Sequence, residues 1–357
     1  MSAQRINKIR KHFKQENLDG ILVTHLDQIR YLTGFTGSAG LLVITTVSSD
    51  FLTDFRYTDQ AKKEVRGAKV IITSGASNST LKEIKHLKKK NLRLGYDPQY
   101  LTVLDKKNFK TALLHSILIS APDIFEELGW VKDKSELALI KKAVKISDIA
   151  FERIINIVVP GVGENELAAE LEYQMIMLGS EKPAFETIVA SGYRSAMPHG
   201  VASSKKVKKG DFITFDFGAT SGGYVSDITR TVVVGKATSR QKKIYNLVLK
   251  SHLAGIRKVK SGIMGQKVDK TCRDIITKAG FGKNFGHGTG HGIGYYVHVG
   301  PSLSPRSKDK LMTNNVITIE PGIYISGWGG VRIEDDVVVT KNGGIPLNKS
   351  PKNLLEL

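Results

Sequence analysis

Short apolar runs rich in β-branched side chains alternate with longer, charged stretches over residues 6–121. The apolar runs are 21–23, 41–44, 70–72 and 117–119, and the charged stretches with helical character include 79–90 and 102–114. Strands that alternate with helices in this way are typical of a mostly parallel α/β sheet. The pattern therefore predicts an α/β N-terminal domain over residues 1–130.

Beyond residue 130 helical segments and hairpin-like strands are interspersed. Asp133 and Glu136 have capping-box spacing and begin a helix with one apolar stripe that runs to Pro160, and Thr238 and Gln241 begin another. Further helices are predicted at 164–178 and 266–279, and strands at 187–190, 212–217, 224–234, 316–319 and 331–339. This pattern predicts an α+β C-terminal domain over residues 131–357, and a chain of 357 residues is long enough for two domains.

The chain carries 53 Lys and Arg against 34 Asp and Glu, a formal net charge of +19. Such a surplus first suggests nucleic acid or an anionic surface as a partner. However, the basic runs 88–90 and 205–209 have no interleaved aromatic residues, which is typical of solvated faces. No apolar run reaches the ~18 residues of a membrane span. We therefore expect neither nucleic acid nor a membrane as a partner.

The cysteine content points to a reducing environment. Cys272 is the single cysteine, so the chain cannot form an internal disulfide bond. Basic residues are spread through the first fifteen positions instead of preceding an apolar segment, which argues against a secretory signal. Both observations favour a cytoplasmic protein.

Two aspartates of the C-terminal domain lie where an isolated charge would be costly. Asp216 is part of the apolar strand 212–217, and Asp227 follows eleven residues later, after a glycine-containing turn. A hairpin centred near residues 221–222 would place the two residues directly opposite each other, with Cβ atoms ~5 Å apart. Because buried carboxylates need a partner, this arrangement indicates a cation between them.

The segment 286–294 combines histidines with an unusual density of glycine. His287 and His291 are four residues apart, as in a zinc-binding helix, but five glycines in nine residues disfavour a helix there. Glycine instead permits an extended backbone that can bring an imidazole close to carboxylates. His199 and His298 also fall in apolar or glycine-rich motifs. Together the four histidines favour a functional role.

Two further acids follow or interrupt apolar segments. Glu320 ends the apolar run 316–320, and Glu334 lies within 330–336. The resulting set of candidate metal ligands is Asp216, Asp227, His291, Glu320 and Glu334. Two divalent ions would balance its four carboxylates, and oxygen-rich ligation with one imidazole suits Mn²⁺, Co²⁺ or Zn²⁺. Two ions ~3.5 Å apart lower the pKa of a bridging water and polarise a carbonyl, so metal-assisted hydrolysis is predicted.

Six motifs resemble those of the pita-bread metallopeptidases, and most closely those of the Xaa-Pro aminopeptidases and Xaa-Pro dipeptidases (prolidases) of peptidase family M24. They are Met197-Pro-His-Gly200, Phe215-Asp-Phe-Gly218, Ser226-Asp-Ile-Thr-Arg-Thr231, His287-Gly-Thr-Gly-His-Gly292, Glu320-Pro-Gly-Ile-Tyr324 and Val331-Arg-Ile-Glu-Asp335. Segments 31–40 and 51–57 resemble the family's creatinase-type N-terminal domain. The resemblance covers almost the whole chain and implies an α/β creatinase-like domain before an α+β pita-bread catalytic domain.

The resemblance also implies roles for individual residues. Asp227 and Glu334 would bridge both ions. Asp216 would chelate one ion, and His291 and Glu320 would each bind on one side.

Other roles concern the substrate. Glu320 would also carry the proton from the attacking water to the leaving proline nitrogen. His199 and His298 would orient the scissile carbonyl and stabilise the tetrahedral intermediate. Residues around the ligands or in the substrate pocket would be His287, Tyr324 and Arg332.

The activity implied is hydrolysis of the peptide bond preceding proline in short Xaa-Pro peptides, with a metal-bridging hydroxide as nucleophile. Two divalent ions per chain, Mn²⁺ being the first choice, and a homodimer are expected from the family. General peptidases handle this bond poorly, because it is a tertiary amide without an N–H group. Dipeptidase and aminopeptidase stay open as alternatives, since Arg332 occurs in both kinds.

Two other interpretations use the same scaffold. One is a catalytically inactive module that binds peptide or nucleic acid, and the other is a creatinase-like amidinohydrolase without metal. The five candidate ligands argue against both. The chain departs from the family pattern at Tyr296 and Val299, and Val299 replaces the usual acidic neighbour of His298.

Overall fold

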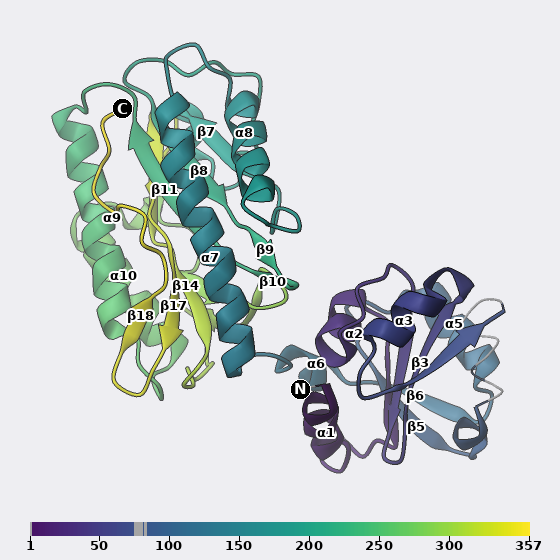
Figure 1. The fold of residues 1–357 in the computed structure, drawn as a ribbon. Helices are drawn as coiled ribbons and strands as arrows, with labels where there is room; N and C mark the ends of the chain where they lie inside the picture. Colours follow the sequence, from purple (N-terminus) through teal and green to yellow (C-terminus); the bar gives the residue numbers. More distant parts are fainter. Residues whose placement is uncertain (1, 75–80, 82–83) are drawn as a thin grey trace. The chain divides into compact units, whose positions relative to one another are not determined.

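The computed structural model describes residues 2–74, 81 and 84–357 (Figure 1). The chain divides into two compact units, Met1–Leu128 and Gly129–Leu357. Among the helices of the described residues, none has both the length and the apolar character that crossing a bilayer requires.

The first unit is built on a six-stranded sheet with the strand order β4-β3-β2-β1-β5-β6. Its strands are β1 Gly20–Val23, β2 Leu41–Thr45, β3 Ser49–Asp54, β4 Lys69–Thr73, β5 Leu92–Tyr96 and β6 Ser116–Ser120. The four predicted apolar runs form β1, β2, β4 and β6. The sheet is mixed, because β2 pairs antiparallel with both β1 and β3 while the other neighbours are parallel.

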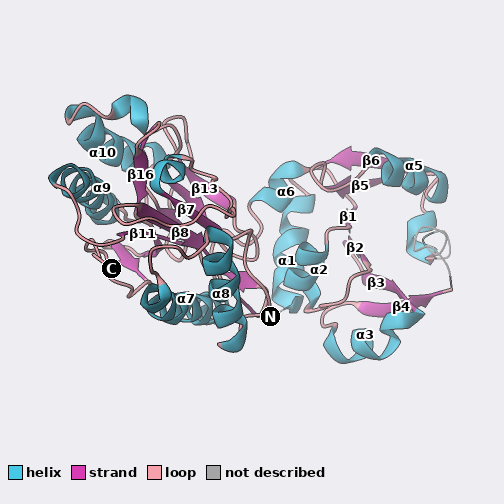
Figure 2. Cartoon of the chain, turned by 90° about the horizontal axis from the view of Figure 1, so that it is seen from above, coloured by secondary structure: helices cyan, strands magenta, loops and turns pink. Residues whose placement is uncertain are grey.

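Helices cover both faces of this sheet. They are α1 Ser2–Phe13, α2 Leu26–Thr33, α3 Thr58–Glu64, α5 Val103–Ala112 and α6 Pro122–Glu126, with 3₁₀ turns at Phe55–Tyr57 and Lys85–Lys88. Figure 2 shows α1 and α2 along one face, while Phe109 of α5 packs with Leu22 and Val43 on the other. The predicted helix 102–114 corresponds to α5. The predicted helix 79–90 lies partly outside the described residues, and its described part includes the 3₁₀ turn.

The second unit has its strands inside and its long helices outside (Figure 1). The helices are α7 Lys134–Ile154, α8 Glu164–Met177, α9 Ser239–Lys258 and α10 Gly265–Lys278, with 3₁₀ turns at Ile155–Ile157, Gly192–Ala196 and Gly282–Asn284. The strands are β7 Ile188–Ser191, β8 Phe212–Phe217, β9 Thr220–Ser221, β10 Tyr224–Val225, β11 Ile228–Val233, β12 Gly290–Gly292, β13 Val299–Leu303, β14 Val316–Ile319, β15 Gly322–Ile325, β16 Gly329–Arg332, β17 Asp335–Val339 and β18 Gly344–Pro346.

Two helix pairs each cover one of the larger sheets. Apolar residues of α7 and α8, such as Phe151 and Leu171, pack with Phe215 of the sheet β11-β8-β7. Apolar residues of α9 and α10, such as Ile256 and Val268, pack against the sheet β13-β12-β14-β17-β18. The inner faces of the sheets are thereby left for polar side chains.

Both predicted capping boxes are present. The Asp133 carboxylate accepts from the backbone N–H of Glu136 at 2.9 Å, and Glu136 accepts from the Asp133 N–H at 2.7 Å. Thr238 and Gln241 make the same reciprocal pair at the start of α9. The first helix is shorter than predicted, because α7 ends at Ile154 and a 3₁₀ turn precedes Pro160.

Two segments that were predicted as single strands each form two strands, so these two predictions were wrong. The segment 224–234 forms β10 and β11, and the segment 331–339 forms β16 and β17, each pair in different sheets. Asp227 and Glu334 lie in these two breaks. Their backbone N–H groups leave the regular ladder and donate to Asp336 Oδ2 at 3.0 Å and to the Thr229 carbonyl oxygen at 3.1 Å.

The basic run 205–209 is only partly the solvated face that its sequence predicts. Lys205 is an ion-pair partner of Asp211, at 2.8 Å, and Lys206 pairs with Glu166. Val207 is buried. This run is therefore a structural element as well as a charged surface.

Arg230 on β11 connects the breaks to the end of the chain. Its guanidinium is 1% exposed and pairs with Asp335 at 2.8 Å. It also donates to the carbonyl oxygens of Glu334, at 2.5 Å, and of Ser350 and Pro351, at 3.0 Å each. A single buried cation thus holds the backbone around Glu334 against the C-terminal segment.

Replacing Arg230 with Met should strongly destabilise the fold, because the buried Asp335 carboxylate loses a charged partner. Breaking a buried pair costs about 3–5 kcal/mol, and we expect the midpoint of thermal unfolding to fall by roughly 10 °C. Lys270→Met is the matched control, since its exposed pair with Asp274 is worth about 1 kcal/mol or less. Equal effects of the two variants in thermal denaturation would contradict this account.

Candidate metal centre

The second unit contains a cavity of about 480 Å³. All the candidate site residues except Tyr324 line it, from the strands β8, β12 and β16 and from the connections beside them: His199, Asp216, Asp227, His287, His291, His298, Glu320, Arg332 and Glu334. Tyr324 reaches the same group through its hydroxyl, which is 2.8 Å from both His287 Nε2 and Arg332 Nη1. Residues more than 130 positions apart in sequence therefore meet at one site.

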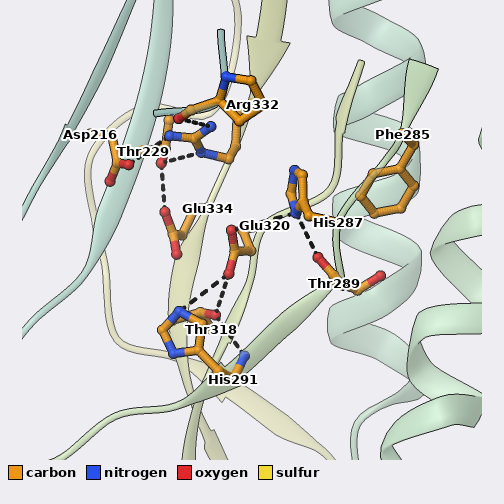
Figure 3. Close-up of polar contacts among 12 residues, drawn as sticks. Asp216, Thr229, Phe285, His287, Thr289, His291, Thr318, Glu320, Arg332 and Glu334 are labelled. Atoms are coloured by element: carbon orange, nitrogen blue, oxygen red, sulfur yellow. Dashed lines mark hydrogen bonds and ion pairs between the residues drawn. The ribbon is translucent and has the colours of Figure 1, made fainter. Parts of the chain in front are cut away.

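A compact donor cluster lies in this cavity. One ligand atom each from Asp227, His291 and Glu334 lies within 4.8 Å of the others. His291 Nε2 is 3.4 Å from Glu320 Oε1 and 3.7 Å from Asp227 Oδ2. Figure 3 shows Glu334 and Glu320 lying between His291 and the Arg332 side chain.

Asp216 lies on the same wall but faces a cation of the protein. Its Oδ2 accepts from Arg332 Nη2 at 2.6 Å, whereas its Oδ1 is buried without a hydrogen-bond partner among the described residues. The predicted register of the hairpin was wrong by two residues: Asp216 pairs with Thr229 and not with Asp227. Because side chains alternate with a period of two, this shift leaves Asp216 on the predicted face.

The acids of the cluster hold their protons more tightly than exposed carboxyls do. Burial, and then the charges of Glu334 and Asp216, raise the pKa of Asp227 well above its usual range. Burial, and then Glu320 and Asp216, do the same to the pKa of Glu334. Burial also raises the pKa of Glu320. Each of these carboxylates would gain from a nearby cation.

Three imidazoles at the cluster favour the neutral form. Burial lowers the pKa of His287, His291 and His298. His291 Nδ1 lies 3.1 Å from the Gly292 carbonyl oxygen, which requires the proton on Nδ1. The lone pair of His291 Nε2 therefore faces the carboxylates, the arrangement in which a histidine binds a metal ion.

His298 has a different neighbour from the one that the family pattern supplies. Its ring lies 4.3 Å from that of His291, centroid to centroid. Val299 begins β13 and pairs with Gly292. The pKa of His298 is lowered first by burial and then by His291, while the charges of Glu320 and Asp216 oppose this shift.

All three nitrogens of the Arg332 guanidinium donate hydrogen bonds within the site. Besides Asp216, its guanidinium donates to Thr229 Oγ1 at 2.9 Å, to the Tyr324 hydroxyl and to the Pro198 carbonyl oxygen at 3.2 Å. Although burial opposes it, the charges of Tyr324 and Asp216 raise the pKa of Arg332 well above its usual value. This side chain remains a cation that orders the wall around Asp216.

Two known protein families match the sequence of the chain. The family model described as metallopeptidase family M24 matches residues 138–341, more than half of the chain, and the creatinase/prolidase N-terminal domain matches residues 5–128. The chain belongs to metallopeptidase family M24. These matches confirm the predicted fold class, an α/β creatinase-like domain followed by an α+β pita-bread domain.

Relatives resemble this M24 chain over its whole length. It is 36% identical over 356 residues to the Xaa-Pro dipeptidase of Pyrococcus horikoshii, covering 99% of both proteins. The structure of an Xaa-Pro dipeptidase from Bacillus anthracis covers 100% of both chains at 42% identity, with a TM-score of 0.96. That of an X-Pro aminopeptidase from Thermotoga maritima covers 99% of both at 36% identity, with a TM-score of 0.90. The relatives named Xaa-Pro dipeptidase confirm the predicted enzyme class, a metallo-exopeptidase.

The residues present fit divalent metal ions. The donor set offers carboxylate oxygens and one imidazole nitrogen, which hard or borderline divalent ions accept. Asp216 Oδ1 has no hydrogen-bond partner among the described residues, and the pKa values of Asp227 and Glu334 are raised, so both observations leave room for a cation at this site.

Sequence reasoning missed two hydroxyls that orient the acids. Thr229 Oγ1 donates to Glu334 Oε2 at 2.5 Å, and Thr318 Oγ1 donates to Glu320 Oε1 at 3.1 Å. Each threonine is two residues from a candidate ligand in sequence, Asp227 or Glu320. The period of two along a strand places such residues on one face and could have identified them.

Metal binding to this M24 site should depend on pH. Carboxyls with raised pKa values stay protonated in the folded apoprotein where the unfolded chain is ionised, so apoprotein stability falls as pH rises above about 4. Divalent ions displace these protons. We expect Mn²⁺ to raise the midpoint of thermal unfolding more at about pH 8 than at about pH 6, measured against the protein in chelator.

Two variants test the origin of this effect. Asp227→Asn should abolish most of the Mn²⁺-dependent stabilisation, because it removes a carboxylate of the cluster. Glu166→Gln, which changes an exposed acid of α8, should retain it. A stabilisation by Mn²⁺ that does not vary with pH would contradict the assignment of the raised pKa values to the metal site.

Proposed function

We propose that this M24 metallopeptidase hydrolyses the peptide bond preceding proline in short Xaa-Pro peptides, using two divalent ions. The observation that carries the proposal is the convergence of buried carboxylates and a neutral imidazole in one cavity. Relatives similar over the full length of the chain are named Xaa-Pro dipeptidases and an X-Pro aminopeptidase, which supports the substrate class.

The proposed ligands of the two ions are those of the candidate set. Asp227 and Glu334, the central pair, would bind both ions. Asp216, His291 and Glu320 would complete their coordination. Mn²⁺ is the proposed ion, with Co²⁺ or Zn²⁺ as alternatives, and when bound such ions activate water and polarise a carbonyl.

The protein's own groups would supply proton transfer and charge stabilisation. Glu320, with its raised pKa, would accept the proton of the attacking water and deliver it to the proline nitrogen, which has no proton of its own. His199 and His298 would donate hydrogen bonds to the carbonyl oxygen as negative charge develops on it. The pair of Tyr324 and Arg332 would order the pocket beside them.

The protein should cleave an Xaa-Pro dipeptide after loading with Mn²⁺, and chelator should abolish the activity. Asp227→Asn should give a folded protein whose turnover is lower by at least about 100-fold, because the ions lose a shared ligand. Peptide release is measured by chromatography, with metal content determined in parallel. Xaa-Pro-Yaa, offered alongside, decides between dipeptidase and aminopeptidase activity.

The number of bound metal ions per chain distinguishes the enzyme from the alternative function, a catalytically inactive binding module on the same scaffold. The charge of +19 favours that alternative. About two ions per chain support the enzyme. Failure to bind any ion after Mn²⁺ loading, or unchanged turnover in Asp227→Asn, would contradict the proposed site.

His298→Ala should lower kcat by about 100-fold, because one donor to the developing negative charge is lost. The metal content should be unchanged, since His298 is outside the proposed ligand set. His115→Ala, an exposed histidine of the first unit, is the control and should retain full activity. A fall in both activity and metal content for His298→Ala would assign this residue to the metal site instead.

A homodimer and a cytoplasmic location remain proposals. The dimer is supported by the resemblance of the first unit to creatinase-type domains, and the location by the single cysteine. Light scattering of the purified protein tests the dimer directly.

A further inference from the structure

We propose that Glu164 is a positioning residue that holds the loop carrying His199 in its working place. The inference rests on the proposed function, in which His199 contacts the scissile carbonyl. The loop, residues 192–203, follows β7 and is called the His199 loop.

Glu164 is a buried carboxylate that binds both ends of the His199 loop. Its side chain, at the start of α8, is 0% exposed. Oε1 accepts from the N–H and the hydroxyl of Ser191, at 2.7 and 2.8 Å, just before the loop. Oε2 accepts from Arg194 Nε at 2.9 Å and from the N–H and hydroxyl of Ser203, at 3.2 and 2.7 Å. One carboxylate thereby closes the loop at its base.

Arg194 extends this clamp toward the histidine. Its Nε pairs with Glu164, and its Nη2 donates to the carbonyl oxygen of Val201, two residues beyond His199. The guanidinium thus connects Glu164 at the base of the loop with the backbone beside His199, which is the tip of the loop. It would lose its anionic partner if Glu164 were neutral.

The other side of the tip is tied to the metal-ligand wall. The Pro198 carbonyl oxygen accepts from Arg332 Nη1 at 3.2 Å, and Arg332 Nη2 pairs with Asp216 at 2.6 Å. Two arginines therefore hold the backbone on either side of His199. Arg194, which is bound to Glu164, holds the Val201 carbonyl oxygen, and Arg332 of the metal-ligand wall holds that of Pro198.

The histidine depends on these backbone supports. His199 is exposed, and no hydrogen bond to its imidazole is present among the described residues. Its position relative to a substrate is consequently set by the loop backbone. Since displacement of a catalytic group by about 1 Å can cost about 100-fold in rate, loosening the base of the loop should reduce turnover without any change at the metal ligands.

Glu164 does not belong to the cavity wall, so its effect would be indirect. Glu166 is the matched control, because it is an acid of the same helix that accepts from the Gly163 N–H and pairs with Lys206. Its carboxylate makes no bond to the His199 loop among the described residues. The pair Glu164→Gln and Glu166→Gln thus compares the same chemical change with and without the clamp.

The experiment uses the full chain loaded with Mn²⁺ and an Xaa-Pro dipeptide. Glu164→Gln should lower kcat by roughly 10- to 100-fold with KM changed by less than about threefold, and with unchanged metal content. Glu166→Gln should stay within about twofold of the wild type. A fall in metal content, or an unchanged kcat, would overturn the proposal.

A double mutant separates positioning from general stability. If Glu164 acts through His199, then Glu164→Gln should have almost no further effect in a His199→Ala background, within about twofold. An equal loss in both backgrounds would overturn the proposal. If Glu164→Gln does not fold, Ser203→Ala, which removes one of the five hydrogen bonds, enters the same cycle with the same two outcomes.

Hydrogen exchange tests the clamp independently of the proposed function, because the measurement needs no substrate. Without any substrate, the backbone amides of Met197, Gly200 and Val201, which are hydrogen-bonded within the loop, should exchange at least about 10-fold faster in Glu164→Gln than in the wild type or in Glu166→Gln. Unchanged exchange would overturn the clamp itself. Absence of Xaa-Pro cleavage by the wild type would overturn the proposed function and leave this measurement of the clamp intact.

Discussion

The mutual repulsion of four carboxylates around one cavity is the constraint on which the rest of the catalytic unit depends. Asp227, Glu320 and Glu334 respond to it with raised pKa values, and Asp216 by pairing with Arg332. The hydroxyls of the neighbouring threonines each bond a single oxygen of Glu334 or Glu320, and Arg332 is the one Arg or Lys among the described residues that line the cavity. A family M24 site of this kind therefore favours the binding of cations.

The strands meet this constraint by breaking where the central acids lie. Asp227 and Glu334 sit between strands that belong to different sheets. Behind them, buried Asp335 is held by Arg230, His252 and Lys352, the histidine also bonding the Ile319 carbonyl oxygen beside Glu320. Basic side chains thus hold the backbone from outside the cavity, so that the acids inside it remain available.

Charge is distributed oppositely on the surface and in the site. The chain as a whole is strongly basic, yet the cavity is lined by five acids against the single cation Arg332. Burial lowers the pKa of three of its histidines, His287, His291 and His298. The surplus of lysines therefore says little about the ligand, whereas the few buried acids define the chemistry of the site.

The sequence by itself determined the helix starts at Asp133 and Thr238 and the chemical types of the donors, because capping spacing and isolated acids in apolar strands are local signals. Only the tertiary structure decided that Asp216 pairs with Thr229 and that both acid-bearing strands break. Alternation in a strand specifies which face a side chain occupies, not its register. The contacts that choose the register and hold the acids, such as Thr229 with Glu334, join residues about a hundred positions apart, where no local pattern records them.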